Sequence, residues 1–110
     1  MTFSPGDILM VDVVFTDQSQ MKQRPALVLR AADSDGDFIV APITSQPGHT
    51  NTVALTAAEL VSGSLPKASW VRADHIHSIH ESTIVKRFGA VKPPVMKSVL
   101  AILCPSIGCK

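Results

Sequence analysis

Two short segments of this 110-residue chain combine residue types that could act on a phosphate group. In Lys22-Gln23-Arg24-Pro25, a polar stretch becomes a strand at an arginine. A guanidinium fixed there could present five N–H donors to a phosphate, although exposed arginines at strand edges are common. Thr44-Ser45 follows an apolar run. Its hydroxyls could donate to a nonbridging phosphate oxygen, or could bond their own backbone in a turn.

A third segment is rich in histidine and reads His75-Ile76-His77-Ser78-Ile79-His80. In an extended strand, His75 and His77 share one face, where they could line a groove, carry protons near neutral pH or bind a metal. A metal would need further ligands, and only His80, His49 or a distant carboxylate is available. We therefore expect no metal site, and ordinary half-exposed strand histidines are the simplest interpretation.

Charge and missing motifs narrow the class of function. The chain lacks GxxxxGK[ST], GxGxxG, HExxH and GxSxG, which argues against nucleotide hydrolysis and dinucleotide binding. Its net charge of +1 excludes a strongly basic protein that coats nucleic acid. Positive charge is nevertheless concentrated, at +3 in residues 22–30 and +5 in residues 82–110. These segments could hold a polyanion locally, or could simply be solvated surface.

The elements that must position these residues are mostly short strands separated by Gly and Pro. Alternation in the first predicted strand, Ile8–Phe15, places Leu9, Val11, Val13 and Phe15 on one face. A polar connection, Thr16–Gln23, then leads to a strand that starts near Arg24, where Pro25 suits only a strand start or an edge. The remaining expected elements are a turn at Asp33–Gly36, strands at Phe38–Ile43, Thr52–Leu55, Ala68–Ile79 and Phe88–Val91, and a loop at Gln46–Asn51.

One amphipathic helix is expected near the end of the chain. Pro93-Pro94 can open a helix, and apolar residues from Val95 to Leu103 recur at spacings of three and four until Pro105 ends it. Thr56–Leu60 could add one helical turn. Five or six strands and a terminal helix predict a mainly β (α+β) fold, a small barrel or curled sheet. An apolar content of 45% in 110 residues fills one core, so residues 1–110 are expected to form a single domain.

Three further features indicate a cytoplasmic protein. No stretch is long and apolar enough to span a membrane. The first residues lack a basic leader and an apolar segment typical of export. The chain has two cysteines, Cys104 and Cys109, fewer than a disulfide-stapled domain carries, so we expect both to be reduced.

Four blocks together resemble the MazF/PemK family, toxins of bacterial toxin–antitoxin modules, from about residue 4 to residue 103. The resemblance implies an SH3-like β-barrel with a C-terminal helix, a homodimer, and a cognate antitoxin as partner. It also implies sequence-selective cleavage of single-stranded RNA without metal or cofactor, leaving a 2′,3′-cyclic phosphate and a 5′-OH. The blocks are Pro5-Gly6-Asp7-Ile8, Lys22-Gln23-Arg24-Pro25-Ala26-Leu27-Val28-Leu29, Ile39-Val40-Ala41-Pro42-Ile43-Thr44-Ser45 and Leu65-Pro66-Lys67-Ala68-Ser69-Trp70-Val71-Arg72-Ala73-Asp74-His75-Ile76.

The resemblance places the family's catalytic arginine on Arg24 and its catalytic threonine on Thr44. It places Ser69, Asp74 and His75 near the substrate groove. We expect Trp70 to be the platform for base stacking, because most phenylalanines fall in strand cores. The other expected RNA contacts are Gln20, Lys22, Ser45 and His77.

The chain departs from the family pattern at two places. Ser19-Gln20-Met21-Lys22-Gln23 stands where many members have an acidic residue and glycines, and His75 stands where Gln is frequent. We therefore expect a different RNA recognition sequence. One alternative is a binding protein on the same fold, either a gyrase-poisoning toxin or a member that only captures its antitoxin. A more distant alternative is a metal hydrolase that uses His75, His77 and His80.

Overall fold

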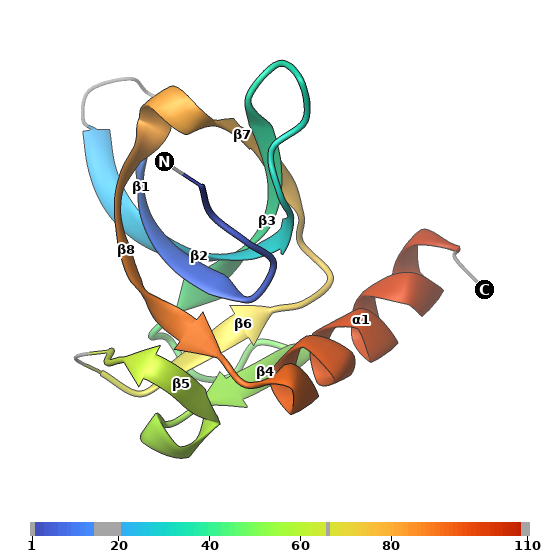
Figure 1. The fold of residues 1–110 in the computed structure, drawn as a ribbon. Coiled ribbons are helices and arrows are strands. Elements are labelled where there is room, and N and C mark those ends of the chain that lie inside the picture. The colour runs from blue at the N-terminus through green and yellow to red at the C-terminus, as the bar shows by residue number, and fades with distance from the viewer. Residues whose placement is uncertain (1, 15–20, 66, 109–110) are drawn as a thin grey trace.

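Antiparallel pairing of short strands into one curled sheet gives the molecule its shape (Figure 1). The computed structural model describes residues 2–14, 21–65 and 67–108. The described elements are β1 (Asp7–Val14), β2 (Met21–Arg30), β3 (Asp37–Thr44), β4 (Thr52–Leu55), η1 (Ala57–Glu59), β5 (Leu60–Gly63), β6 (Ser69–Arg72), β7 (His77–His80), η2 (Glu81–Thr83), β8 (Ile84–Val91) and α1 (Pro93–Ile107).

The strand order is β4-β6-β3-β2-β1-β8-β5, and β7 pairs with β3 beside this path. In Figure 1, β1, β2, β3, β7 and β8 form the curled part of the sheet, while β4, β5, β6 and α1 gather at one end. Strand β3 joins the two parts, because it pairs with β7 over residues 37–40, with β2 over 39–42 and with β6 at Ile43 and Thr44. The predicted mainly β fold with a terminal helix is therefore confirmed.

Alternation along the central strands buries side chains on both faces of the sheet. One cluster fills the inside of the curl, and the other packs between the sheet and α1 (Figure 1). The inner cluster consists of Phe3, Leu9, Val11, Ala26, Val28, Phe38 and Val40. The helix-side cluster consists of Ile8, Leu27, Ala41, Ile43, Leu55, Val71, Ala73, Val91, Val95 and Val99. A strand that is buried on both faces needs a nearly continuous apolar run, as β1, β2 and β3 have.

Three predicted strand limits are wrong. Strand β2 begins at Met21 rather than near Arg24, because β1 pairs with it from Val14 onward. Strand β8 begins at Ile84 rather than Phe88, because its first residues pair with the other edge of β1. The predicted strand Ala68–Ile79 is two strands, β6 and β7, separated by a turn. Phe15 and the rest of the connection up to residue 20 lie outside the described residues.

The helix starts as predicted but extends further. Helix α1 begins at Pro93 and runs past Pro105 to Ile107, so the expected end before Pro105 is wrong. Pro105 lies in the last turn, where its missing N–H removes one hydrogen bond and does not interrupt a longer helix. Gly108, at φ 83°, then caps the helix by donating its N–H to the Cys104 carbonyl. The expected helical turn near Thr56 is present as η1, with Thr56 and Glu59 forming a capping box.

Cys104 is disulfide-bonded, so the expectation of reduced cysteines is wrong for this residue. The number of cysteines in a sequence does not show whether two of them can form a disulfide. That depends on the distance between the backbones of the two cysteines in the folded chain. Cys109 lies outside the described residues. Among the described residues, no helix has the length and apolarity needed to cross a membrane.

Strand β5 pairs with β8 through facing glycines, which predicts a position that cannot accept a side chain. A Cβ at Gly89 would overlap the Ser62 carbonyl oxygen, whereas a Cβ at Gly48, at φ 93°, has no atom within 4 Å. Gly89→Ala should therefore lower the free energy of unfolding by about 2 kcal/mol or more through overpacking. Gly48→Ala should lower it by only about 1 kcal/mol through backbone strain. Equal urea midpoints for the two variants would contradict this packing.

Candidate active site

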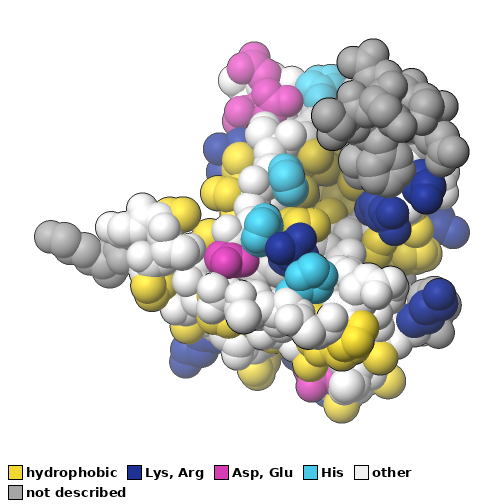
Figure 2. Space-filling view, turned by 180° about the vertical axis from the view of Figure 1, so that it is seen from behind, with side chains coloured by type: hydrophobic (Ala, Val, Ile, Leu, Met, Phe, Trp, Pro, Cys, Tyr) yellow, Lys and Arg dark blue, Asp and Glu magenta, His cyan; other side chains and the backbone are white. Residues whose placement is uncertain are grey.

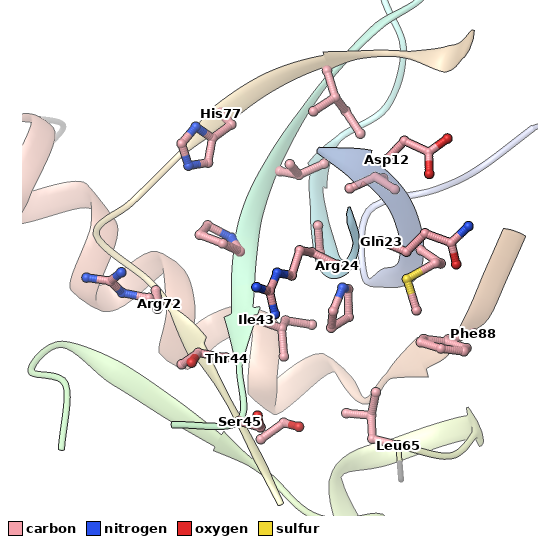
Figure 3. A pocket seen from close by; sticks show the side chains of 18 of the residues that line it. Asp12, Gln23, Arg24, Ile43, Thr44, Ser45, Leu65, Arg72, His77 and Phe88 are labelled. Atoms are coloured by element: carbon pink, nitrogen blue, oxygen red, sulfur yellow. The ribbon is translucent and has the colours of Figure 1, made fainter. Parts of the chain in front are cut away.

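A groove of about 900 Å³ opens on the inner side of the curled sheet (Figure 3). Its walls come from β1, β2, β3, β6, β7 and β8, and from the connection between β5 and β6. Segments far apart in the sequence therefore meet around one space. The residues that line it are Met10, Val11, Asp12, Gln23, Arg24, Pro25, Ala26, Val40, Pro42, Ile43, Thr44, Ser45, Gln46, Leu65, Lys67, Ser69, Arg72, His77, Ser78, Ile79 and Phe88.

Arg24 and Thr44 reach this groove from neighbouring strands. The β2–β3 ladder ends at the pair of Ala26 and Pro42. Arg24 lies two residues before Ala26, and Thr44 lies two residues after Pro42, so both lie just beyond this end of the ladder. Because side chains two residues apart share a strand face, the two project on the same side as Ala26 and Pro42. In Figure 3 the Arg24 guanidinium extends toward the end of β3 that carries Thr44. The groove thus holds a permanent cation and a hydroxyl from adjacent strands.

The Thr44 hydroxyl is oriented by its own backbone. Its Oγ1 accepts a hydrogen bond of 3.0 Å from the Gln46 N–H, which is the turn interaction that the sequence left open. A hydroxyl has two lone pairs and one proton, so this bond still leaves the proton for donation. Thr44 is half-buried and Arg24 is exposed. A fixed hydroxyl and an exposed guanidinium in one groove are suited to binding an anionic oxygen.

The histidines separate in the structure. His77, on β7, lines the groove, whereas His75 lies in the connection after β6 and is not part of the lining. The expectation that the two share a strand face is wrong, because the chain turns at Ala73 and Asp74. His80 bonds elsewhere, to the Asp35 carbonyl and the Ser82 hydroxyl.

Among the described residues, the histidines form no group of three potential metal ligands. The one group in that part of the chain whose ligand atoms lie close enough to hold a metal ion is exposed or half-exposed and consists of Asp33, Asp35 and Asp37. Asp33 Oδ1 already accepts hydrogen bonds from the backbone N–H groups of Asp35 and Asp37, as in an ordinary Asx turn. The described geometry therefore does not support a metal hydrolase built on His75, His77 and His80.

The other predicted contacts fall in different places. Ser45 and Ser69 line the groove, and the Ser69 hydroxyl donates to the Lys67 carbonyl at 2.9 Å. Lys22 is exposed on β2 and Trp70 is half-buried on β6, and neither lines the groove. Asp74 is held in the turn after β6. Gln20 lies outside the described residues.

Among the lining residues that sequence reasoning missed are Asp12, Gln23, Arg72 and Phe88. The signal for Gln23 and Arg72 was their place inside the segments that resemble the family. Lys86 Nζ lies 5.3 Å from the centre of the Phe88 ring, so an aromatic face with a nearby cation borders the groove. No local pattern distinguished Phe88 from the phenylalanines of the core.

The charged lining favours an anion. Arg24, Lys67 and Arg72 contribute three positive charges and Asp12 one negative charge, which gives +2 with histidines neutral. The whole chain carries only +1. Positive potential is therefore concentrated at the groove, where it would raise the local concentration of a polyanion.

Asp74 stays ionised because of its neighbours. Asn51 Nδ2 donates to Asp74 Oδ2 at 3.1 Å, and this bond holds the pKa of Asp74 below its ordinary value of 3.8. Desolvation opposes this shift, and the charges of His75 and Arg72 support it. The Asn51–Asp74 bond ties the loop before β4 to the turn after β6, which borders the groove.

Comparison with known proteins identifies the family. The family model described as "PemK-like, MazF-like toxin of type II toxin-antitoxin system" matches residues 4–107. The chain belongs to this family. No curated protein matches this PemK/MazF-family chain.

Solved structures agree with the assignment of this PemK/MazF-family chain. MazF (Form-I) of Deinococcus radiodurans is 27% identical with a TM-score of 0.75, and 98% of each chain is covered. A MazE–MazF structure (Form-II) of the same organism is 26% identical with a TM-score of 0.73, covering 100% of this chain and 99% of the other. An endoribonuclease in complex with its cognate antitoxin, from a mycobacterial species, shares the fold at 18% identity and a TM-score of 0.74, over 98% and 95% of the chains.

The Asp74 interaction predicts a pH dependence of stability for this PemK/MazF-family protein. Because folding lowers the Asp74 pKa, its stabilising contribution is complete above pH 3.8 and is lost as the pH falls through the lower, folded value. The urea midpoint of unfolding should fall less between pH 5 and pH 2.5 in Asp74→Asn than in the wild-type protein. Asp35→Asn, an equal charge change in an exposed turn, is the control. An acid profile that Asp74→Asn leaves unchanged would show that the bond does not stabilise the fold.

Proposed function

We propose that residues 1–110 form a single-domain toxin that cleaves single-stranded RNA as a metal-independent endoribonuclease and thereby blocks translation. The observation that carries this proposal is the register of β2 and β3, which brings Arg24 and Thr44 to one face of one groove. Binding an antitoxin or gyrase does not require a cation and a hydroxyl at a shared phosphate position. The family assignment supports the same function, as does the likeness to a mycobacterial protein that is named an endoribonuclease.

RNA supplies its own nucleophile in the proposed reaction. The 2′-oxygen attacks the adjacent phosphorus as its proton leaves, and the bond from phosphorus to the 5′-oxygen breaks. That oxygen takes up a proton, so the products are a 2′,3′-cyclic phosphate and a 5′-OH. Negative charge grows on the nonbridging oxygens in the pentacoordinate state. Arg24 would bind these oxygens and Thr44 would donate one further hydrogen bond, so stabilisation increases as the transition state is approached.

Proton transfer calls for a group other than Arg24. A guanidinium has a pKa above 12, so its deprotonated form is too scarce at neutral pH to act as a base. His77 lines the groove, whereas His75 Nε2 accepts a hydrogen bond from Arg72 Nη2 at 2.9 Å, so this nitrogen is already occupied. We therefore assign the transfer of the 2′-OH proton to His77 rather than to His75. An imidazole accepts and returns protons near neutral pH.

The remaining proposed roles concern binding. Ser45 and Ser69 would contact RNA in the groove, and Lys22, on the Arg24 face of β2, would contact its continuation. The Deinococcus MazE–MazF structure and the mycobacterial complex support a cognate antitoxin as partner. We further propose a homodimer that acts in the cytoplasm, where its mRNA substrate is translated.

A cleavage assay tests the catalytic pair. Purified protein with EDTA and a long single-stranded RNA should give fragments with 2′,3′-cyclic phosphate and 5′-OH ends. Arg24→Ala should lower the rate on the order of 10²-fold or more, as expected for loss of an oxyanion donor. Thr44→Ala should lower it less, and Thr44→Ser should restore it. Arg30→Ala, on the same strand outside the groove, is the matched control.

Two outcomes of the cleavage assay would contradict the proposal. Cleavage that EDTA abolishes would point to a metal nuclease. A folded protein that leaves RNA intact would point to the alternative of a binding member without nuclease activity.

The role of His77 predicts a pH dependence of cleavage. A general base acts only in its deprotonated form, so the rate should rise with pH and then level off. His77→Ala should be slower and should remove this rise. His49→Gln, in an exposed loop outside the groove, should keep the wild-type profile. A wild-type rate that is flat between pH 5 and pH 8 would exclude a histidine base.

A further inference from the structure

A second arginine, Arg72, lines the groove from β6. Thr44 pairs with Trp70 of that strand, and Arg72 lies two residues further along. In the view of Figure 3, Thr44 lies between the Arg24 and Arg72 side chains. Arg72 therefore borders the proposed cleavage position on the side away from Arg24.

The Arg72 side chain is held in place by its neighbours. Its Nη2 donates to His75 Nε2 at 2.9 Å, and because arginine only donates, the proton of neutral His75 must be on Nδ1. Asp74 Oδ1 lies 3.6 Å from the same His75 nitrogen, and Asn51 holds the other oxygen of Asp74. Figure 2 shows that histidine, basic and acidic side chains gather near the middle of one face of the molecule. The network fixes the direction of the guanidinium.

This network leaves one buried donor and one buried acceptor unused. Within the described part of the chain, the buried Arg72 Nε and Asp74 Oδ1 have no hydrogen-bond partner. Buried polar atoms without partners are rare, and each needs an explanation. An anionic oxygen in the groove would supply an acceptor for the Arg72 guanidinium.

A purely structural role for the Arg72 side chain is the competing explanation. The turn between β6 and β7 is already closed by its backbone, because the His75 N–H donates to the Arg72 carbonyl at 3.1 Å. The side chain is therefore not needed to close this turn. Its charge matters more for the groove, since its loss would halve the net charge of the lining from +2 to +1.

We propose that Arg72 binds a phosphate of the RNA substrate next to the scissile one, and that His75 and Asp74 are its positioning residues. This inference rests on the proposed function, because it extends the same groove by one phosphate subsite. The ligand is an RNA backbone phosphate, which a guanidinium binds through paired N–H donors. A neighbouring contact of this kind would hold the strand in register while Arg24 and Thr44 act.

Binding to single-stranded RNA with 2′-O-methyl groups tests Arg72, because the blocked nucleophile separates affinity from cleavage. Arg72→Ala should weaken binding about tenfold at moderate salt. The slope of the logarithm of the binding constant against the logarithm of the salt concentration should also become shallower by about 0.7. This is the value for one lost phosphate contact with a single strand. With unmodified RNA, KM should rise more than kcat falls. Lys97→Ala, which removes one positive charge from exposed α1, should leave the slope unchanged.

Variants of His75 test the positioning role. His75→Gln retains an acceptor for Arg72 and should keep wild-type affinity and salt slope. His75→Leu removes the acceptor and should resemble Arg72→Ala. In the Arg72→Ala background, His75→Leu should have little further effect, because the two residues act through one contact.

The outcomes separate this inference from the proposed function. Suppose that the wild-type protein cleaves RNA, and that Arg72→Ala and Arg72→Gln fold and bind RNA with the wild-type salt slope. The Arg72 subsite is then wrong, and the nuclease proposal stands. If wild-type protein neither binds nor cleaves RNA, both are wrong. Arg72→Gln retains most of the side-chain volume, so a loss of slope in this variant supports the subsite even if Arg72→Ala does not fold.

Discussion

The pairing register of β2 and β3 is the constraint on which the proposed site depends. Val28 pairs with Val40, Leu27 with Ala41 and Ala26 with Pro42. A slip by one residue would turn every side chain of one strand to the opposite face. It would move Arg24 away from Thr44, and it would also exchange the residues of the inner and helix-side clusters. The two cores therefore hold the register that brings the site together.

Two prolines lie where the β2–β3 ladder ends. Pro42 belongs to the last pair, and beyond it β3 takes β6 as its partner. Pro25 lies just past that pair, where β2 remains bonded to β1 alone and is locally an edge. Proline has no N–H to donate, so both residues suit a point where two strands separate. The separation opens the groove between β2 and β6, directly beyond the buried ladder.

The sequence contained the local patterns but not the pairing partners. Alternation in β1, the apolar run of β3, the glycine turn at Gly36 and the apolar spacing of α1 were sufficient to predict a curled sheet with a terminal helix. The start of β2 was missed because residues 21–23 show no apolar alternation. They form a strand because they pair with β1. The turn at Ala73 and Asp74 has neither Gly nor Pro, so His75 was wrongly placed on a continuous strand. Arg72 and Phe88 were missed because their place in the groove depends on contacts between distant segments.

Strand β3 connects both parts of the proposed binding surface. It fixes Arg24 through its pairing with β2 and fixes the strand of Arg72 through its pairing with β6, while Thr44 lies at its own end. Both arginines are thus placed relative to the hydroxyl by backbone hydrogen bonds rather than by flexible loops. Transition-state stabilisation falls steeply when donors are misplaced by an ångström or so. A toxin that relies on a few charged groups therefore benefits from placing them on paired strands, where the cores on both sides of the sheet resist such displacement.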